Sequence, residues 1–136
     1  MEQVKTKHGL IFRSAVMDKT KEVIHPMVQE QFAKYGMTLE EIRKEMATYL
    51  VFNVGTVVGR WRQVDKYYDL LFVYNSEPGN GHFDDVLEYF EHACKRDKLD
   101  LMFSEVWNKK FGKHLRKKRG FKDKGGFAYI KSYLNM

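Results

Sequence analysis

The fold is decided by residues 67–94, which read YYDLLFVYNSEPGNGHFDDVLEYFEHAC. An apolar run from Tyr68 to Tyr74 leads into a glycine-bearing turn, and the turn leads into a segment whose apolar residues recur at helical spacing. A short apolar run bounded by turn residues is typical of a strand, and the spacing i, i+3, i+4, i+7 is typical of an amphipathic helix. The stretch therefore predicts a strand, a tight turn and a helix.

Two glycines make the turn a candidate anion site. Gly79 and Gly81 can take positive φ without steric cost, which lets successive backbone N–H groups point toward one place. The following helix directs its positive N-terminal end to the same place. The pattern favours a site for a phosphate group, and the alternative is a tight connection with no ligand.

The helix after the turn carries an apolar stripe of Phe83, Val86, Leu87, Phe90, Ala93 and Cys94, while Asp84, Asp85, Glu88 and Glu91 are expected outside it. A second apolar strand is predicted at residues 99–107. Because a helix separates this strand from residues 68–74, the two strands are expected to be parallel neighbours in a right-handed βαβ unit.

The other predicted elements complete an α/β domain with a mixed sheet. In chain order they are a strand or short hairpin at residues 4–15, a helix at 18–36, a helix after the capping box at 38–41, residues 50–52 and 56–61 as a strand pair or one bent strand, a basic helix at 108–118, a turn at 123–126 and a strand at 127–134.

Composition favours one globular domain over residues 1–136. The 136 residues are 43% hydrophobic and 15% aromatic, with two prolines and no low-complexity segment. The apolar runs are too short to span a bilayer and the N-terminus does not resemble a secretion signal, which predicts a soluble, cytoplasmic protein. Cys94, the single cysteine, is expected to be a buried, inert thiol.

The net charge of +6 is unevenly distributed. From Glu77 to Glu105 there are eight acidic residues and three basic ones, whereas from Lys109 to Lys124 there are nine Lys or Arg residues and one acid, Asp123. Such a basic segment suits nucleic acid, an acidic protein or a phosphate-bearing cofactor. The alternative is a solvated helix face.

From residue 50 to residue 134 the order of elements and the local motifs resemble the GNAT superfamily of acyl-CoA-dependent N-acyltransferases. In that family the central strand ends at a turn of pattern Q/R-x-x-G-x-G/A, and a Gly-Phe pair follows the last short helix. Here residues 76–81, SEPGNG, supply both glycines at that spacing, and residues 115–121, LRKKRGF, resemble the ending of the short helix.

The resemblance implies a central mixed, mostly antiparallel sheet with one parallel βαβ unit, and transfer of an acetyl group from acetyl-CoA to an amine. A backbone N–H near Val73 or Tyr74 would polarise the thioester carbonyl. The residues implied to hold the CoA pyrophosphate are Ser76, Gly79, Asn80, Gly81 and His82.

Three residues depart from the family pattern. Ser76 replaces the usual Gln or Arg, and Glu77 places a carboxylate beside the proposed pyrophosphate site. Arg116 stands where many members have the tyrosine that protonates the departing thiolate, and an arginine cannot act as an acid near neutrality.

Several titratable residues are candidates for proton transfer. Glu105 and Asp69, each on one of the parallel strands, could accept the proton of the amine, and His82 and His114 are further candidates because histidine as a residue type has an ordinary pKa near neutrality. Tyr129 or Tyr133 could replace the missing acid. For all of them a surface, capping or packing role is the alternative.

A second hypothesis is a GNAT-like scaffold or interaction protein that does not bind acyl-CoA. Residues 86–121 resemble in layout the degenerate acyltransferase-like domains of internal virion proteins of short-tailed phages, which implies a location in a virion. Such a protein would make contacts through the basic segment or through aromatic residues such as Trp61 and Tyr67. A plain nucleic-acid-binding module is a third class, supported by charge alone, and a homo-oligomer is compatible with all three.

Other chemistries find no support in the sequence. The five histidines do not show the spacing of a zinc site, and neither a G-x-S-x-G elbow nor a Gly-Lys-Ser/Thr phosphate loop is present.

Overall fold

The computed structural model describes residues 6–16, 33–34, 36–38, 40–41, 44, 49–106 and 108–133. Its elements are β1 (Arg13–Val16), β2 (Leu50–Val54), β3 (Val57–Val64), β4 (Tyr67–Asn75), α3 (His82–Asp97), β5 (Asp100–Phe103), α4 (Lys109–Lys118), β6 (Lys122–Gly125) and β7 (Ala128–Lys131). The helix predicted at residues 18–36 lies almost entirely outside the described residues.

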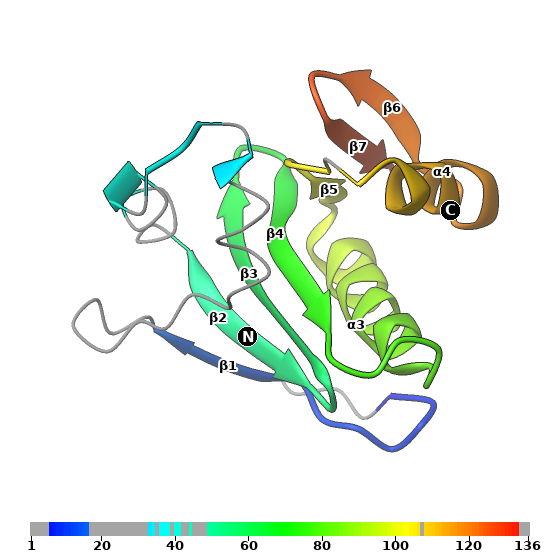
Figure 1. Cartoon of the computed structure of the whole chain (residues 1–136). Helices are drawn as coiled ribbons and strands as arrows, with labels where there is room; N and C mark the ends of the chain where they lie inside the picture. The colour runs from blue at the N-terminus through cyan, green and yellow to red at the C-terminus, as the bar shows by residue number, and fades with distance from the viewer. Residues whose placement is uncertain are drawn as a thin grey trace.

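The described strands form one seven-stranded sheet in the order β1-β2-β3-β4-β5-β7-β6 (Figure 1). Among the described strands only the pair β4–β5 is parallel, and α3 connects these two strands. All other pairs are antiparallel. The predicted α/β class, with a mostly antiparallel sheet and one parallel βαβ unit, is therefore confirmed.

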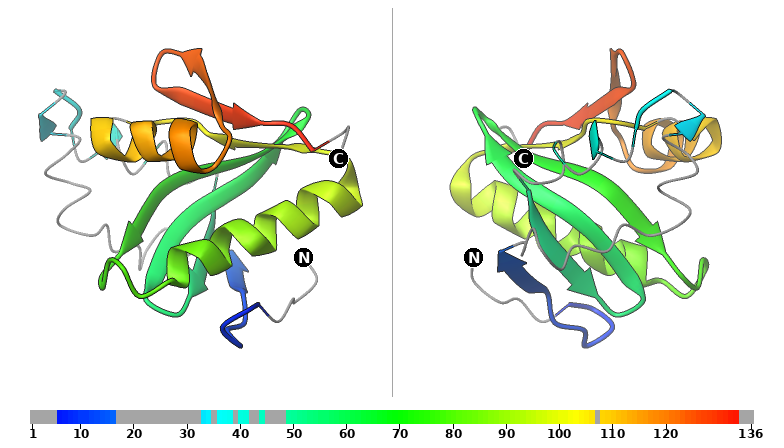
Figure 2. Two further views of the ribbon diagram at one scale, coloured as in Figure 1. Left: turned by 90° about the vertical axis from the view of Figure 1, so that its right-hand side faces the viewer. Right: turned by 60° about the vertical axis from the view of Figure 1, so that its left-hand side comes forward.

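Two helices lie against the sheet at different places. Figure 2 shows α3 running across one face of the central strands, while α4 lies beside the β6–β7 hairpin. The capping box is also confirmed, because the Glu41 N–H donates to Thr38 Oγ1 at 3.2 Å and the Thr38 N–H donates to the Glu41 carboxylate at 3.3 Å.

Residues 50–61 form an antiparallel hairpin rather than one bent strand, with its turn at Gly55 and Thr56. The strand predicted at 99–107 is shorter, ending at Phe103, because the chain turns away from β4 after Ser104. The turn predicted at 123–126 is wrong: residues 122–125 are β6, and the turn is at Gly126 and Phe127. The last strand is correspondingly shorter than predicted, ending at Lys131.

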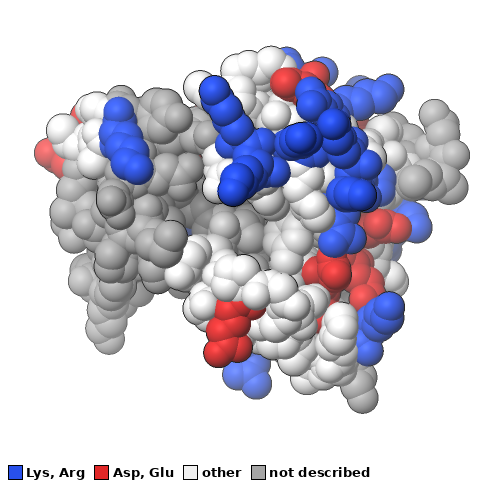
Figure 3. All heavy atoms as spheres, turned by 45° about the vertical axis from the view of Figure 1, so that its right-hand side comes forward, with Lys and Arg blue, Asp and Glu red and all other residues white. Residues whose placement is uncertain are grey.

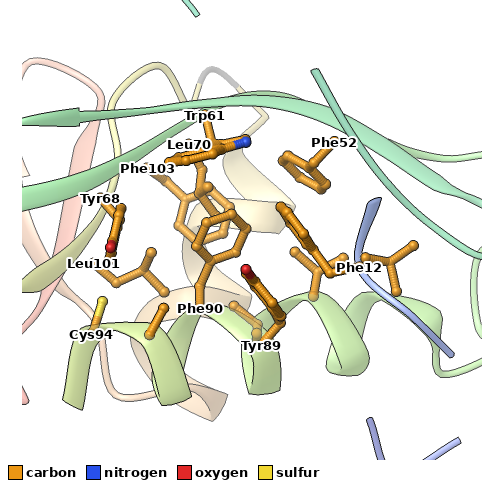
Figure 4. Close-up of a cluster of buried hydrophobic side chains, with 14 of the residues drawn as sticks. Phe12, Phe52, Trp61, Tyr68, Leu70, Tyr89, Phe90, Cys94, Leu101 and Phe103 are labelled. Atoms are coloured by element: carbon orange, nitrogen blue, oxygen red, sulfur yellow. The ribbon is translucent and has the colours of Figure 1, made fainter. Parts of the chain in front are cut away.

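The core between α3 and the sheet is aromatic (Figure 4). Phe90 is fully buried and makes edge-to-face contacts with Phe12 and Phe52, with ring centroids 5.4 and 5.5 Å apart. The ring of Phe12 is stacked on that of Tyr89 at 3.8 Å. Through these contacts Phe12, which directly precedes β1, packs against α3, so a residue far from the helix in sequence completes the core.

Most of the predicted stripe of α3 is buried, with Phe83 partly exposed. Two predictions of exposure are wrong. Asp85 is 0% exposed because His8 covers it, and Trp61 is 6% exposed because it packs in the core, so it cannot be a contact residue on the surface. Cys94 is buried as predicted, and burial raises the pKa of its thiol to about 12.

No helix among the described residues is both long enough and apolar enough to cross a membrane.

The buried position of Phe90 predicts a large loss of stability when its ring is removed. Phe90→Ala should lower the free energy of unfolding by about 3–5 kcal/mol, because the cavity would lie between the helix and the sheet. Urea unfolding measures the change. The control is Val58→Ala, whose native side chain is 41% exposed and whose loss should cost less than about 1 kcal/mol. Equal losses for the two variants would contradict this core.

Candidate functional site

The two edges of β4 are paired over different lengths. On one edge β4 pairs with β3 from Tyr67 to Asn75. On the other edge the pairing with β5 runs only from Tyr67 to Leu70, and the Ser104 N–H donates to the Leu70 carbonyl at 3.3 Å. Beyond that point the described residues show no pairing of β4 with β5, so the two parallel strands part.

A β-bulge lies where the strands part. Val58 is opposite Tyr74 and Arg60 is opposite Leu71, so two residues of β4 face Gly59 alone. These two residues are Phe72 and Val73. A bulge interrupts the regular alternation of backbone N–H groups and turns one of them out of the ladder. The bulge lies at Val73 and beside Tyr74, where the family resemblance implies a backbone N–H group that polarises the thioester carbonyl.

The turn after β4 has the backbone conformation that its glycines allow. Gly79 has φ of +88° and Gly81 has φ of +86°, both in the left-handed region. A Cβ atom at Gly79 would meet nothing within 4 Å, whereas one at Gly81 would lie 3.1 Å from the His8 ring. The turn is thus open at Gly79 and covered by the N-terminal segment at Gly81.

Side chains from three elements fix this turn. Thr56 Oγ1 donates to Asn75 Oδ1 at 2.7 Å and accepts from Asn80 Nδ2 at 2.6 Å. His82 Nδ1 accepts from the Thr56 backbone N–H at 3.1 Å. The β2–β3 turn therefore holds the β4–α3 turn in place, and Gly55 allows the approach because a Cβ there would lie 2.5 Å from the His82 ring.

The same side chains accept hydrogen bonds from some of the backbone N–H groups that were expected to bind an anion. The Glu77 N–H donates to Asn75 Oδ1 and the His82 N–H donates to Asn80 Oδ1, each at 3.0 Å. Among the described residues, none accepts a hydrogen bond from the backbone N–H groups of Gly79, Asn80 or Gly81. An anion at this turn would therefore be held by the middle of the segment 76–82.

Charges around the start of α3 are partly balanced. His8 Nδ1 lies 2.8 Å from the Asp85 carboxylate and the His8 backbone N–H donates to it at 3.3 Å. Arg119 is ion-paired with Asp84. Glu77 is exposed and has no cationic partner among the residues that the structure describes. The turn therefore carries one uncompensated negative charge.

A second polar cluster surrounds Asp69. The Tyr49 hydroxyl donates to Asp69 Oδ2 at 2.7 Å, and Arg62 Nε lies 3.4 Å from the same oxygen. Burial, together with the bond to Asp69, raises the pKa of Tyr49 well above its ordinary value, so that the phenol remains a donor. Asp69 is 1% exposed, and among the described residues its buried Oδ1 has no hydrogen-bond partner.

The other predicted residues lie near the end of β5 and on α4. Glu105 is exposed, two residues after β5 ends. Tyr129 is partly buried, and its hydroxyl lies 2.5 Å from where a Cβ of Gly112 would be, so it packs against α4. His114 is partly buried and accepts from Arg119 Nε at 3.1 Å, while Tyr133 is 5% exposed in the core.

Sequence reasoning missed His8, Tyr49, Thr56 and Asn75. None of them belongs to a motif, since each acts through a contact with a distant part of the chain. Asn75 alone gave a signal, because an Asn that ends a strand before a turn often accepts a backbone N–H two residues later.

A groove of about 490 Å³ lies between α3, the end of α4 and β7. Phe121 and Tyr133 line it, and two of its acids are neutralised, Asp84 by Arg119 and Glu91 by Lys95 at 3.0 Å. The groove shares only Asp84 with the start of α3. It is therefore separate from the turn at residues 76–82.

The network at the turn predicts the tautomer of His82. Because the Thr56 N–H donates to Nδ1, the neutral ring should carry its proton on Nε2. Long-range ¹H–¹⁵N correlation NMR above neutral pH should show His82 Nδ1 as an unprotonated nitrogen. His92, which is exposed, serves as the internal control and should show exchanging tautomers. A protonated Nδ1 in His82 would contradict the network.

Comparisons with known proteins identify the fold. No family model and no curated protein matches the sequence. An acetyltransferase of the GNAT family from Listeria monocytogenes 4b F2365 is similar in structure, with a TM-score of 0.53 and 15% identity over 97% of this chain and 100% of that one. The PaiA N-acetyltransferase from Thermoplasma acidophilum, in complex with coenzyme A, is also similar in structure. Its TM-score is 0.51 and its sequence identity is 13%, over 90% of this chain and 99% of that one. The chain therefore shares the fold of these two structures.

Proposed function

We propose that this protein transfers an acetyl group from acetyl-CoA to an amine. The observation that carries the proposal is the meeting of three features at one end of β4: the bulge at Phe72 and Val73, the end of the pairing with β5, and the double-glycine turn into α3. The similar PaiA structure is a coenzyme A complex, which supports the same ligand here.

The residues present fit a pyrophosphate at the turn. The N–H groups of Gly79, Asn80 and Gly81 would hold it, together with the start of α3. Ser76 and His82 border the site, and the His82 N–H itself is already bonded to Asn80. The Glu77 carboxylate would repel a bound anion, and this repulsion costs on the order of 1 kcal/mol when both charges are solvated.

Acetyl-CoA, when bound, supplies a thioester whose carbonyl carbon accepts the lone pair of the amine. The backbone N–H of Val73, with Tyr74 beside it, would donate to the carbonyl oxygen as negative charge develops there. Glu105, exposed where β5 leaves β4, would accept the proton of the amine. To polarise the carbonyl, the bulge needs to supply only its backbone and no side chain.

Asp69 would bind the amine. A buried carboxylate oxygen without a partner is costly, and an amine N–H is a donor that would satisfy it. Tyr49 and Arg62 hold the other oxygen, so the carboxylate is fixed in one orientation. Asp69 thus positions the acceptor, while Glu105 handles its proton.

Tyr129 would supply the proton for the departing thiolate. It comes from β7 and lies against α4 at Gly112, one turn before Arg116, which stands at the position of the family's usual tyrosine. Gly112 is required for this placement because a Cβ would occupy the position of the hydroxyl.

A catalytically degenerate scaffold is the second candidate function. It is favoured by the side chains of Asn75 and Asn80, which already bond two backbone N–H groups of the turn, and by the uncompensated charge of Glu77. Such a protein would keep the fold and use its surface for partners.

Glu77 gives a direct test of acetyl-CoA binding by calorimetry. The wild type should bind one acetyl-CoA per chain, and Glu77→Gln should bind up to about five times more tightly, because it removes a negative charge beside the pyrophosphate. Asp65→Asn makes the same change of charge in the β3–β4 turn, at the other end of β4, and should have no effect. No binding by the wild type at millimolar acetyl-CoA would favour the scaffold.

Two substitutions test the proton transfers by measuring CoA release with a panel of amines. Glu105→Gln should lower kcat about 10²-fold to 10⁴-fold while leaving acetyl-CoA affinity unchanged. Tyr129→Phe keeps the ring against Gly112, so a fall in kcat with a changed alkaline limb of the pH profile would report the hydroxyl alone. Wild-type rates in both variants would remove these residues from the mechanism.

A further inference from the structure

The surface of α4 and β6 carries a continuous group of cations. The cationic face, as we call it, consists of Lys109, Lys110, Lys113, Arg116, Lys117, Lys118, Lys122 and Lys124, all of which are exposed. Figure 3 shows Lys and Arg side chains gathered over α4 and the hairpin, with acidic side chains beneath them. Within the described residues no member of this face has an ion-pair partner.

One member of the face, Lys118, lines the groove that also contains Asp84, Glu88 and Glu91, and the other seven members do not line it. Asp123 is the single acid between Lys109 and Lys124, and its Oδ1 accepts from the Gly125 N–H at 2.8 Å. Lys109 and Lys110 occupy the first turn of α4, where the positive end of the helix disfavours cations. The face is thus electrostatically unfavourable by itself, and a bound polyanion would relieve the repulsion.

The cations are arranged in rows. Lys109, Lys113 and Lys117 follow one another at i, i+4 and i+8 on α4, a row about 12 Å long. Lys122 and Lys124 are two residues apart on β6, and Lys124 lies at an irregularity in the pairing of β6 with β7. A duplex carries about seven phosphate charges over the length of the helix row.

The chemistry of the face favours phosphates over a protein or a membrane. Protein interfaces are depleted of Lys and need an apolar centre, whereas the eight members of the face are all Lys or Arg. The exposed large hydrophobic residue nearest to them in sequence is Phe127, which lies in the β6–β7 turn at the edge of the face. A helix that inserts into a membrane needs a free apolar side, but the apolar side of α4 is packed inward, with Leu115 fully buried and Phe111 against Phe103.

We propose that the cationic face binds the phosphate backbone of a nucleic acid, without sequence specificity. The binding depends on charge and spacing, because seven of the eight members of the face are lysines, which contact phosphates as point charges. It does not rest on the proposed acetyl transfer, since the face does not include the turn at residues 76–82.

Fluorescence anisotropy with a labelled duplex and a labelled single strand tests the proposal over a range of salt concentrations. The wild type should bind both at low salt, with a steep loss of affinity as salt rises. Lys113→Gln/Lys117→Gln should bind at least tenfold more weakly, and the slope of log K against log salt for the duplex should decrease by about 2, since each lost phosphate contact changes it by about 0.9.

A matched control separates the face from net charge. Lys66→Gln/Lys98→Gln makes the same change of charge in the β3–β4 turn and after α3, on residues that are also exposed, and should bind like the wild type. Equal losses in both double variants, or no binding at low salt, would overturn the proposal. So would tighter binding to vesicles of anionic lipid than to the duplex, or displacement of the duplex by CoA at a concentration that saturates only the turn.

Discussion

Strand β4 is held along its whole length by β3 but along only half of its length by β5, and the arrangement of the candidate site follows from this inequality. After Ser104 the chain leaves the sheet, and the Val106 N–H donates to the Phe127 carbonyl at the tip of the hairpin. The free half of β4 contains the bulge and ends in the glycine turn. The backbone N–H groups of this half of β4 can therefore bind a ligand without interrupting the sheet.

The gap between the two strands is bordered by packed rings rather than by flexible side chains. Phe103, at the end of β5, contacts Phe111 of α4 and Phe121 after it, each with ring centroids 5.5 Å apart. Phe83, at the start of α3, contacts Phe111 at 5.4 Å. Both helices are therefore tied to the place where β5 ends, so α4 cannot move relative to α3 without disrupting this cluster.

Electrostatics divides the molecule into two regions with different roles. Near the glycine turn, Asp84 of α3 is ion-paired with Arg119 and Asp85 is hydrogen-bonded to His8, whereas Glu77 has no ion-pair partner among the described residues. On α4 and β6 the cations have no ion-pair partner among the residues that the structure describes. A small phosphorylated ligand would be held at the turn by backbone geometry, whereas a long polyanion would be held at the cationic face by charge.

Local patterns predicted much of this fold, and distant contacts account for what they missed. The apolar stripe predicted α3, and the glycines at 79 and 81 predicted positive φ, because both depend only on neighbours in sequence. The burial of Asp85 was not predictable, since it depends on His8, 77 positions away. The C-terminal turn was misplaced because Asp123 bonds to Gly125 within β6, which a turn pattern resembles.

The most direct measurement is a ¹H–¹⁵N amide titration of the protein with acetyl-CoA at moderate salt. If the free half of β4 is the acyl-CoA site, the amides of Val73, Gly79 and Gly81 should shift first and saturate together at one equivalent. The amides of α4 should then change little, because salt screens non-specific attraction to its lysines. Shifts confined to α4 and β6, with Val73 and the glycine turn unchanged, would contradict the site.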